Sequence, residues 1–478
     1  MNLVFHIAAE EWRYWLRSKL ALSVVALFMV ILAAVSWLTA QHMHSASAEL
    51  AHHQAEAEEV FVSQPDRNPH RMVHYGHYVF RTPVPLALFD PGLDAVTGKA
   101  MFLEGHRQNS ATFTAAGSGG GVGGLSWLTP ALTYQVFAPL LVVLLGFSTL
   151  VRERESGVLA SLLSQGVSGR KVVAGKVLAL FGFVCLLMVP LAISTVAALI
   201  QGESLLAGLA LLGLYLVYLC VWVGLTVWVS IGFRSRSAVI AVLASCWLVF
   251  TLVLPSVAVN VAAVVTPLAG KIETELAMLT ERQDVSDGHS VNNADLERIK
   301  TALFQQYGTD KLEELPVNIR GLLAQKAEQD LTAAMNEYAE KRMAGELRQA
   351  NVLATHGWLT PLLAVAAASR SLSGTDIHHY HKFLRQAETL RYDFVQRINQ
   401  VQVEQLSYID DINRNKDEAS YNRSRVDASN WQLLEEFRFE ANSAQHRLEK
   451  AGISIVMLFV WMLFLAGGLV YSGGRLEP

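Results

Sequence analysis

Long apolar windows without charge alternate along this chain with polar stretches of very different length. Five windows contain no Asp, Glu, Lys or Arg, namely residues 20–40, 177–200, 205–232, 238–265 and 451–471. A sixth window, residues 128–151, is also uncharged but carries Gln135 and two prolines. About 20 apolar residues in helical form are needed to cross the hydrocarbon core of a bilayer. The pattern therefore predicts a mainly α membrane protein with six transmembrane helices.

Two of the polar stretches are long enough to form structure outside the membrane. The first polar segment, residues 41–127, begins with a helix-like run, continues with Pro- and Gly-rich sequence holding short β-like runs, and ends in "GSGGGVGG". The second polar segment, residues 267–450, repeats apolar side chains at helical spacing, as at Phe383, Leu390 and Phe394. We therefore expect two insertions, of which the larger is α-helical and has the size of a domain with its own core.

The N-terminal segment, residues 1–19, contains "FHIAAEEWRYWLRSK" ahead of the first window. Helical spacing places Phe5, Trp12 and Leu16 on one face. Tryptophans beside an apolar face are typical of a helix that lies at the headgroup level of a membrane. We expect an interfacial helix here, and a cytoplasmic extension of the first transmembrane helix is the alternative.

Positive charge predicts the orientation, because cytoplasmic loops of membrane proteins are enriched in Lys and Arg. Of the 38 Lys and Arg residues, those outside the two polar segments all fall on one side if the six helices simply alternate. They are Arg13, Arg17, Lys19, Arg152, Arg154, Arg170, Lys171, Lys176, Arg234, Arg236 and Arg475. Both termini are therefore expected in the cytoplasm and both polar segments outside it. A cleaved signal peptide at residues 20–40 is the alternative.

Two stretches resemble nucleotide-binding loops without meeting their requirements. A phosphate-binding loop reads G-x-x-x-x-G-K-[ST], but in "GRKVVAGKV" five residues separate Gly169 from Gly175, and Val177 replaces the hydroxyl residue. The run from Gly119 to Gly124 fits G-x-G-x-x-G, but a transmembrane helix follows it where a βαβ unit is required, so we interpret it as a linker. We expect no enzymatic activity of the chain itself. Acidic residues outnumber basic ones in the second polar segment, which argues against nucleic-acid binding.

The loop of residues 152–176, on the expected cytoplasmic side, carries a docking signal. Its charges are Arg152, Glu153, Arg154 and Glu155, its apolar helical face is Leu159, Leu162 and Leu163, and Gly166 and Gly169 bound the helix. Acidic groups in a first helical turn suit the helix dipole. A short amphipathic helix of this kind inserts its apolar face into a groove on a soluble partner. The alternative is a capped connector that only satisfies backbone groups at the membrane surface.

The stretch "LVRERESGVLASLLSQGVSGRKVVAGKVLAL" resembles the coupling segment of type-two ABC transporter permeases. The E-R-E-x-G-T-L-like opening of that segment is matched by Glu153, Arg154, Glu155, Gly157 and Leu159. Val158 stands where the family often has Thr, and Gly166 where it often has Pro. A narrower resemblance, carried by "HYGHYVFRTPVPLALFDPG" and "GWLTPLLAVAAASRSLSGTDIHHYHKF", is to a sub-branch with large periplasmic insertions that is loosely linked to multicopper-enzyme maturation.

The resemblance implies a permease subunit of an ATP-driven ABC export system in a bacterial inner membrane. ATP and Mg²⁺ would be bound by a cytoplasmic dimer of separate ABC ATPase subunits, and two permeases, identical or different, would pair among membrane lipids. The residues that would couple the ATPases to the transmembrane helices are Arg152, Glu153, Arg154, Glu155, Gly157, Leu159, Leu162 and Leu163. The alternative is a mechanical transmitter, which uses the same movement to act on a periplasmic or outer-membrane partner without transport.

Histidines concentrate in the two polar segments, which hold all 15 except His6. Imidazole is a common ligand of copper and zinc. The candidate groups are His70, His74 and His77, and His378, His379 and His381. Gly76 argues against one helix through the first group, and structural hydrogen bonding is the alternative role, which we assign to His74 and His106. A histidine-based metal-handling or assembly factor that binds copper or zinc is therefore a third hypothesis.

Overall fold

The computed structural model describes residues 3–112, 128–270, 291–433 and 437–477, with the short pieces 273–274, 276–277 and 279–280. Most of these residues are helical, and one two-stranded sheet accompanies them. Six helices are long and apolar enough to cross a membrane, so the prediction of a mainly α membrane protein is confirmed. The glycine run Gly119–Gly124 lies outside the described residues.

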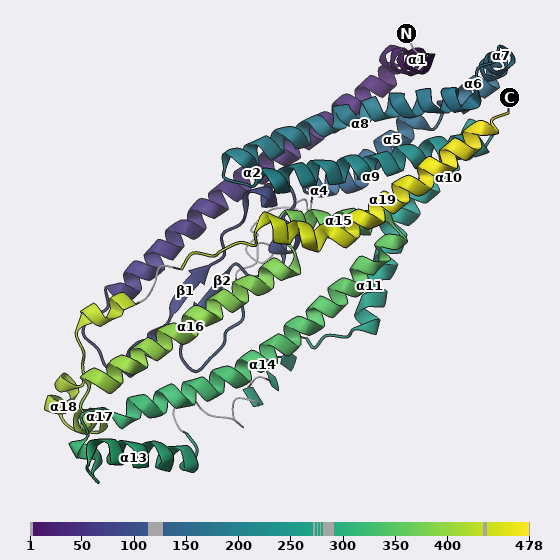
Figure 1. Ribbon diagram of the computed structural model, residues 1–478. Helices are drawn as coiled ribbons and strands as arrows, with labels where there is room; N and C mark the ends of the chain where they lie inside the picture. Colours follow the sequence, from purple (N-terminus) through teal and green to yellow (C-terminus); the bar gives the residue numbers. More distant parts are fainter. Residues whose placement is uncertain are drawn as a thin grey trace.

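The six candidate spans are single helices in four cases and consecutive helical segments in two. The single helices are α2 (Lys19–Val62), α8 (Gly169–Ile200), α9 (Leu205–Gly232) and α19 (Ala444–Gly474). The second span joins α4 (Pro130–Leu132), η3 (Thr133–Phe137), α5 (Ala138–Gly146) and α6 (Val151–Glu155), and the fifth joins α10 (Arg236–Leu248), η4 (Val249–Val253) and α11 (Leu254–Val265). Figure 1 shows α1 (Leu3–Arg17), α7 (Val158–Ser164) and the C-terminus together at one end of this bundle, which we call the terminal end.

Both segmented spans contain a π-helical turn shortly before a proline. The turn η3 ends two residues before Pro139, and η4 ends two residues before Pro255. Proline lacks the backbone N–H that bonds to the carbonyl one turn earlier, and a wider helical turn absorbs this mismatch. These prolines therefore make the two spans locally irregular without ending them.

The helix α2 continues far beyond the predicted window 20–40. It has 44 residues, so at about 1.5 Å per residue it is roughly 66 Å long, twice the thickness of a bilayer's hydrocarbon core. Its second half, α14 (Ile319–Thr355) and α16 (Ile377–Gln405) run away from the terminal end (Figure 1). We call the structure that they form with the smaller elements around them the distal body.

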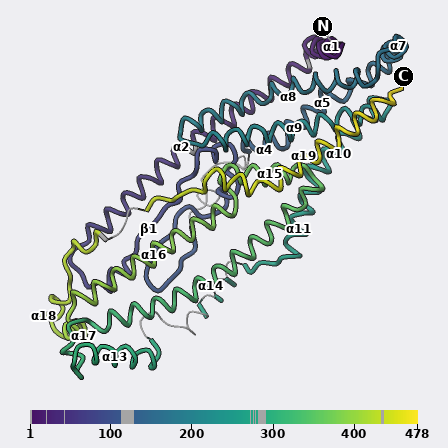
Figure 2. Tube along the Cα trace, in the orientation of Figure 1, coloured from purple at the N-terminus to yellow at the C-terminus, as the bar shows by residue number. Residues whose placement is uncertain are grey.

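The distal body is built from both polar segments. Its smaller elements are α3 (Pro69–Tyr75), β1 (His77–Phe80), η2 (Gly92–Ala95), β2 (Ala100–Leu103), α13 (Asn293–Tyr307), η5 (Leu312–Glu314), α17 (Tyr408–Asn413), α18 (Glu418–Arg423) and η7 (Ala428–Leu433). The strands β1 and β2 pair antiparallel, with His77 opposite Leu103. Phe61 from α2 packs in one apolar core with Phe394 from α16 and the side chain of Trp431. The trace in Figure 2 shows α14 and α16 side by side, and these two helices are in extensive contact.

A buried charge cluster joins α14 to α16 inside the distal body. Arg391 is fully buried, and its guanidinium contacts both carboxylate oxygens of Glu388 at 2.7 and 2.8 Å. The same group lies 2.5 Å from Glu328 on α14. Burial by itself raises the pKa of Glu328, but hydrogen bonds and charge from His106 and Arg391 bring it down to about 2. The cluster is therefore a fixed ionic contact between the two long helices.

The structure differs from the expected division of the chain at α15 (Pro361–Leu372). This helix belongs to the second polar segment, yet it packs against α19 and α9 among the spans. Its side chains Leu362, Val365 and Leu372 are buried in the same apolar cluster as the spans. The short turns η1 (Pro85–Leu88) and η6 (His356–Trp358) flank the same region. The distal body is thus attached to the bundle by packing as well as by its connecting helices.

Buried polar contacts tighten this junction between bundle and distal body. Asp90 is buried and accepts a hydrogen bond from Ser369 at 2.5 Å, and the Ser369 hydroxyl also lies 2.9 Å from the Tyr215 hydroxyl on α9. Burial raises the pKa of Asp90, and the charge of Arg370 opposes that shift. Arg447 of α19 also forms a buried ion pair, with Glu203 in the loop between α8 and α9, at 2.5 Å.

Candidate coupling site

The expected coupling segment consists of two short helices with a glycine between them. The helix α6 ends at Glu155, and α7 begins at Val158. Gly157 has a φ of 76°, and Gly166 beyond α7 has a φ of 85°. Left-handed backbone of this kind strains side chains with a Cβ, so glycine is the natural residue at both turns. The two glycines turn the chain before and after α7.

Four charged side chains from α1, α6 and α8 form a compact cluster beside the coupling segment. Glu11 of α1 and Lys176 of α8 are almost completely buried, and they are in direct contact. Lys176 also contacts Glu153 of α6, and Arg152 of α6 binds Glu11 at 2.7 Å. We call Glu11, Arg152, Glu153 and Lys176 the terminal cluster. Oppositely charged groups that share one buried site attract each other strongly, because little water screens them. The terminal cluster therefore ties α1, α6 and α8 together.

The next two charges of the motif connect the segment to other parts of the terminal end. Arg154 donates a hydrogen bond to the carbonyl of Phe233, just after α9, at 2.9 Å, and to the carbonyl of Glu477 at 3.3 Å. Glu155 forms an ion pair with Arg236 at the start of α10, at 2.6 Å. The residues from Arg152 to Glu155 thus contact α1, α8, the end of α9, the start of α10 and the C-terminal residues.

The apolar face of α7 is directed differently from the sequence expectation. Leu159 is fully buried in the apolar cluster of the spans, and Leu163 packs against that cluster. Leu162 is half-buried, whereas Val158 is 46% exposed and Ser161 is exposed. The leucines therefore hold α7 onto the protein itself, and the outward face available to a partner is the one with Val158 and Ser161.

The stretch that resembles a phosphate-binding loop has a packing role. Gly175 lies against α1, and a Cβ there would come within 2.6 Å of Ile7. Lys176 beside it supplies the buried cation of the terminal cluster. Gly175 thus allows α1 to approach α8 closely, and Lys176 forms an ion pair with the buried Glu11 carboxylate. Glu11 and Lys176 were missed as site residues by the sequence analysis. A signal for Glu11 existed, because it shares a helical face with Ile7 and Trp15.

Neither predicted group of three histidines is found together in the structure. His77 lies in β1, beyond the end of α3 at Tyr75, so it does not share a face with His70 and His74. The expectation from Gly76 is confirmed, and His106 takes the third position in the group instead. In "HHYH", His381 is buried and contacts Glu346 at 2.7 Å, and His379 is buried against Phe439. Within the described residues, His378, His379 and His381 form no three-ligand group.

Acidification is expected to destabilise the distal body through two buried neutral histidines. Burial lowers the pKa of His77 to about 4 and of His379 to about 3, below the value of about 6.5 in an unfolded chain. At pH values between the folded-state and unfolded-state pKa, only the unfolded state binds the proton. The free energy of unfolding therefore decreases by about 1.4 kcal/mol for each of these histidines and for each unit by which the pH is lowered. Melting temperatures of the purified chain between about pH 7 and pH 4.5 measure this. His379→Phe should reduce the slope, and an unchanged slope would contradict the assignment.

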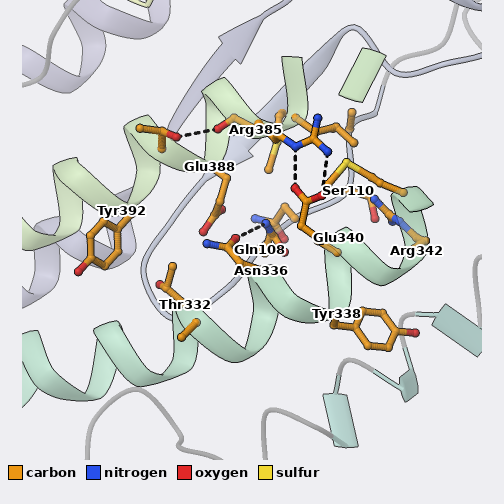
Figure 3. A pocket seen from close by; sticks show the side chains of 18 of the residues that line it. Gln108, Ser110, Thr332, Asn336, Tyr338, Glu340, Arg342, Arg385, Glu388 and Tyr392 are labelled. Atoms are coloured by element: carbon orange, nitrogen blue, oxygen red, sulfur yellow. Dashed lines mark hydrogen bonds and ion pairs between the residues drawn. The ribbon is translucent and has the colours of Figure 1, made fainter. Parts of the chain in front are cut away.

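A cavity of about 470 Å³ lies between α14 and α16 in the distal body. Figure 3 shows Arg385 and Glu340 paired at its edge, through contacts of 2.6 and 2.8 Å. Gln108 and Asn336 approach each other across another part of it at 3.4 Å. The cavity thus combines apolar side chains such as Met101, Met343 and Leu384 with polar ones that partly pair with one another, and it is separate from the coupling segment at the terminal end.

Comparison with protein families identifies the architecture around the terminal cluster. The family described as ABC-2 family transporter protein matches residues 5–287, more than half of the chain. The chain belongs to the ABC-2 transporter family. This ABC-2 permease is a membrane component of an ABC system, and the family implies association with an ABC ATPase. The matched range includes most of α1, five of the six candidate spans and the complete coupling segment.

Most of the second polar segment matches a second family. A domain of unknown function, DUF3526, covers residues 272–440, which hold α13 to α18. A search of the curated proteins found no match to the permease. The resemblance to ABC permeases stated from the coupling motif is therefore confirmed at the level of the family, and most of the second polar segment matches a family of its own.

Proposed function

We propose that the permease is the transmembrane subunit of an ATP-driven ABC export system in a bacterial inner membrane. In this proposal the terminal end faces the cytoplasm, the distal body lies in the periplasm, and a second permease, identical or different, pairs with this one. A dimer of separate ATPase subunits binds ATP and Mg²⁺ and docks on the outward face of α7. The distribution of Lys and Arg supports this orientation.

The observation that carries the proposal is the buried terminal cluster, which includes two residues of α6, the helix joined to α7 across Gly157. A push on α7 is passed to α6 across Gly157, and Glu153 of α6 contacts Lys176 of α8. Lys176 also contacts Glu11, so α1 moves with α8. Ion pairs in a buried site hold their geometry because separating them leaves uncompensated charge. Movement of the ATPases therefore reaches two helices of the permease at once.

A charge on the outward face of α7 is expected to weaken ATPase docking without unfolding the helix. Val158 is the first residue of α7, so Asp in its place suits the helix dipole while it puts a carboxylate on the docking face. Val158→Asp should lower the amount of Walker-motif ATPase that co-purifies in mild detergent at least tenfold. Val158→Thr, of nearly the same shape, is the matched control. Equal recovery of the ATPase with both variants would refute docking at this face.

Mechanical transmission to a periplasmic or outer-membrane partner is the second candidate function. It is favoured by α2, which is one helix from the bundle to the distal body, and by α15, which packs among the spans. In such a device, movement of the spans must displace the distal body. A structure of the complete complex separates the two functions: a polar path between the paired permeases supports transport, and a closed apolar interface supports transmission.

A further inference from the structure

Three histidines of the distal body lie together where the two polar segments meet. The ligand atoms of His70, His74 and His106 all lie within 4.8 Å of one another. The ring centroids of His70 and His74 are 4.9 Å apart, and the ring of His106 lies 5.1 Å from that of His74. We propose that this histidine triad binds one divalent cation of the zinc and copper class, in place of the purely structural hydrogen bonding that the sequence led us to expect for His74 and His106. The proposal goes beyond the transport function and stands independently of it.

The local sequence around α3 presents two of the ligands on one face. Asn68 caps the helix by accepting a hydrogen bond from the backbone N–H of His70 at 3.1 Å, and Pro69 occupies the first helical position. Both residues are favoured at these positions, so the start of α3 is well defined. His70 and His74 are four residues apart and therefore lie one helical turn apart on the same side.

The third ligand comes from the turn that follows β2. The backbone N–H of Gly105 donates to the carbonyl of Val73 in α3 at 2.9 Å, and a Cβ on Gly105 would come within 2.0 Å of Val73. This close approach places His106 beside α3. His106 has a φ of 62°, and it is the one non-glycine residue with positive φ in the described part of the chain. Strain of this kind persists where the surroundings hold it, and it is concentrated at functional sites.

The ring of His106 is oriented by a carboxylate from α14. Glu328 lies 2.8 Å from Nδ1 of His106 and accepts a hydrogen bond from its backbone N–H at 3.1 Å. Arg391 and Thr332 hold this carboxylate in turn. A carboxylate on one ring nitrogen places the proton there, which leaves the other nitrogen as the metal ligand and increases its basicity. This second sphere is what resident zinc and copper sites have in common.

The burial of the three rings fits a site with one open position. His106 is buried, His70 is half-buried and His74 is exposed, so the site opens to solvent on one side. Three imidazoles leave a fourth tetrahedral position for water or an incoming ligand. Metal–nitrogen bonds of about 2.0 to 2.1 Å require the three nitrogens to approach further, and rotation of the exposed His74 ring supplies this movement. A bound cation would join α3 to the turn after β2 and, through Glu328, to α14.

Metal titration of the purified full-length chain tests this proposal. After treatment with a chelator, Zn²⁺ alone is added and binding is followed by calorimetry, and Cu²⁺ is then used to count nitrogen ligands by electron paramagnetic resonance. We expect one Zn²⁺ per chain, a raised melting temperature and a Cu²⁺ signal with three nitrogens. His74→Ala changes an exposed side chain, so the fold should be kept while the affinity falls at least tenfold.

A control pair of histidines separates this site from adventitious binding. His52 and His53 are exposed neighbours on α2, and the double variant His52→Ala with His53→Ala should leave the Zn²⁺ affinity unchanged. Absence of stoichiometric Zn²⁺ binding by the folded wild-type chain would overturn the proposal. It would equally be overturned if His74→Ala had no effect, or if the control pair lost affinity as His74→Ala does.

Discussion

Replacing Lys176 by Met is expected to detach the coupling segment from α1 and α8. Lys176 is the shared partner of Glu11 and Glu153, so its loss leaves Glu153 without its cation and leaves the buried Glu11 carboxylate with Arg152 alone. Removing one partner from a buried ionic site costs about 3 to 5 kcal/mol. We therefore expect a lower melting temperature of the purified permease and at least a tenfold loss of co-purifying ATPase activity.

The matched control for this prediction lies on the same helix. Lys171 is exposed near the start of α8, and Lys171→Met removes the same charge without burying an unpaired one. Its effect on melting temperature should be small, because exposed charges contribute about 0 to 1 kcal/mol. If Lys171→Met and Lys176→Met behaved alike, the terminal cluster would have no special part in holding the coupling segment.

Replacing Arg391 by Met is expected to produce the largest loss of stability in the distal body. The substitution leaves Glu328 and Glu388 buried next to each other without their common cation. Burial raises the pKa of Glu388 even with Arg391 present, so without it one carboxylate must take up a proton or the two long helices must separate. The expected cost is again about 3 to 5 kcal/mol, measured by denaturant unfolding of the purified chain.

An exposed ion pair between the same two helices provides the comparison. Arg385 of α16 binds Glu340 of α14 with two contacts, and both side chains are about half exposed. Arg385→Met should therefore cost less than about 1 kcal/mol. A loss of stability as large as that of Arg391→Met would show that burial does not decide the strength of these contacts.

The helical framework could be predicted from the sequence because its signals are local. Uncharged windows of sufficient length predicted six transmembrane helices, and six candidate spans are present. The end of α3 before His77 was predicted from Gly76 alone, which has a φ of 70°. A transmembrane helix is recognised from one uncharged run of residues, and the end of α3 from one glycine whose backbone conformation other residues rarely adopt.

The residues that make up the two sites could not be predicted, because they come from parts of the sequence that only the fold brings together. Glu11 shares a helical face with Ile7 and Trp15, but nothing in the sequence pairs it with Lys176, which lies 165 residues further along the chain. His106 joins His70 and His74 because the turn after β2 packs on α3, and Glu328 reaches it from a helix more than 200 residues later. The direction of Leu159 likewise follows from packing of α7 on the spans, because an amphipathic face does not itself specify its partner.

Site-specific cross-linking at α7 tests the central claim most directly, namely that the terminal end is where an ABC ATPase docks. A photo-reactive amino acid in place of Ser161, exposed on α7, is activated in native membranes, and the products are identified by mass spectrometry. The same amino acid in place of Glu313, exposed in the distal body, is the control. We predict a cross-link to a Walker-motif ATPase from position 161 and none from position 313. An ATPase captured from position 313 and not from position 161 would contradict the account.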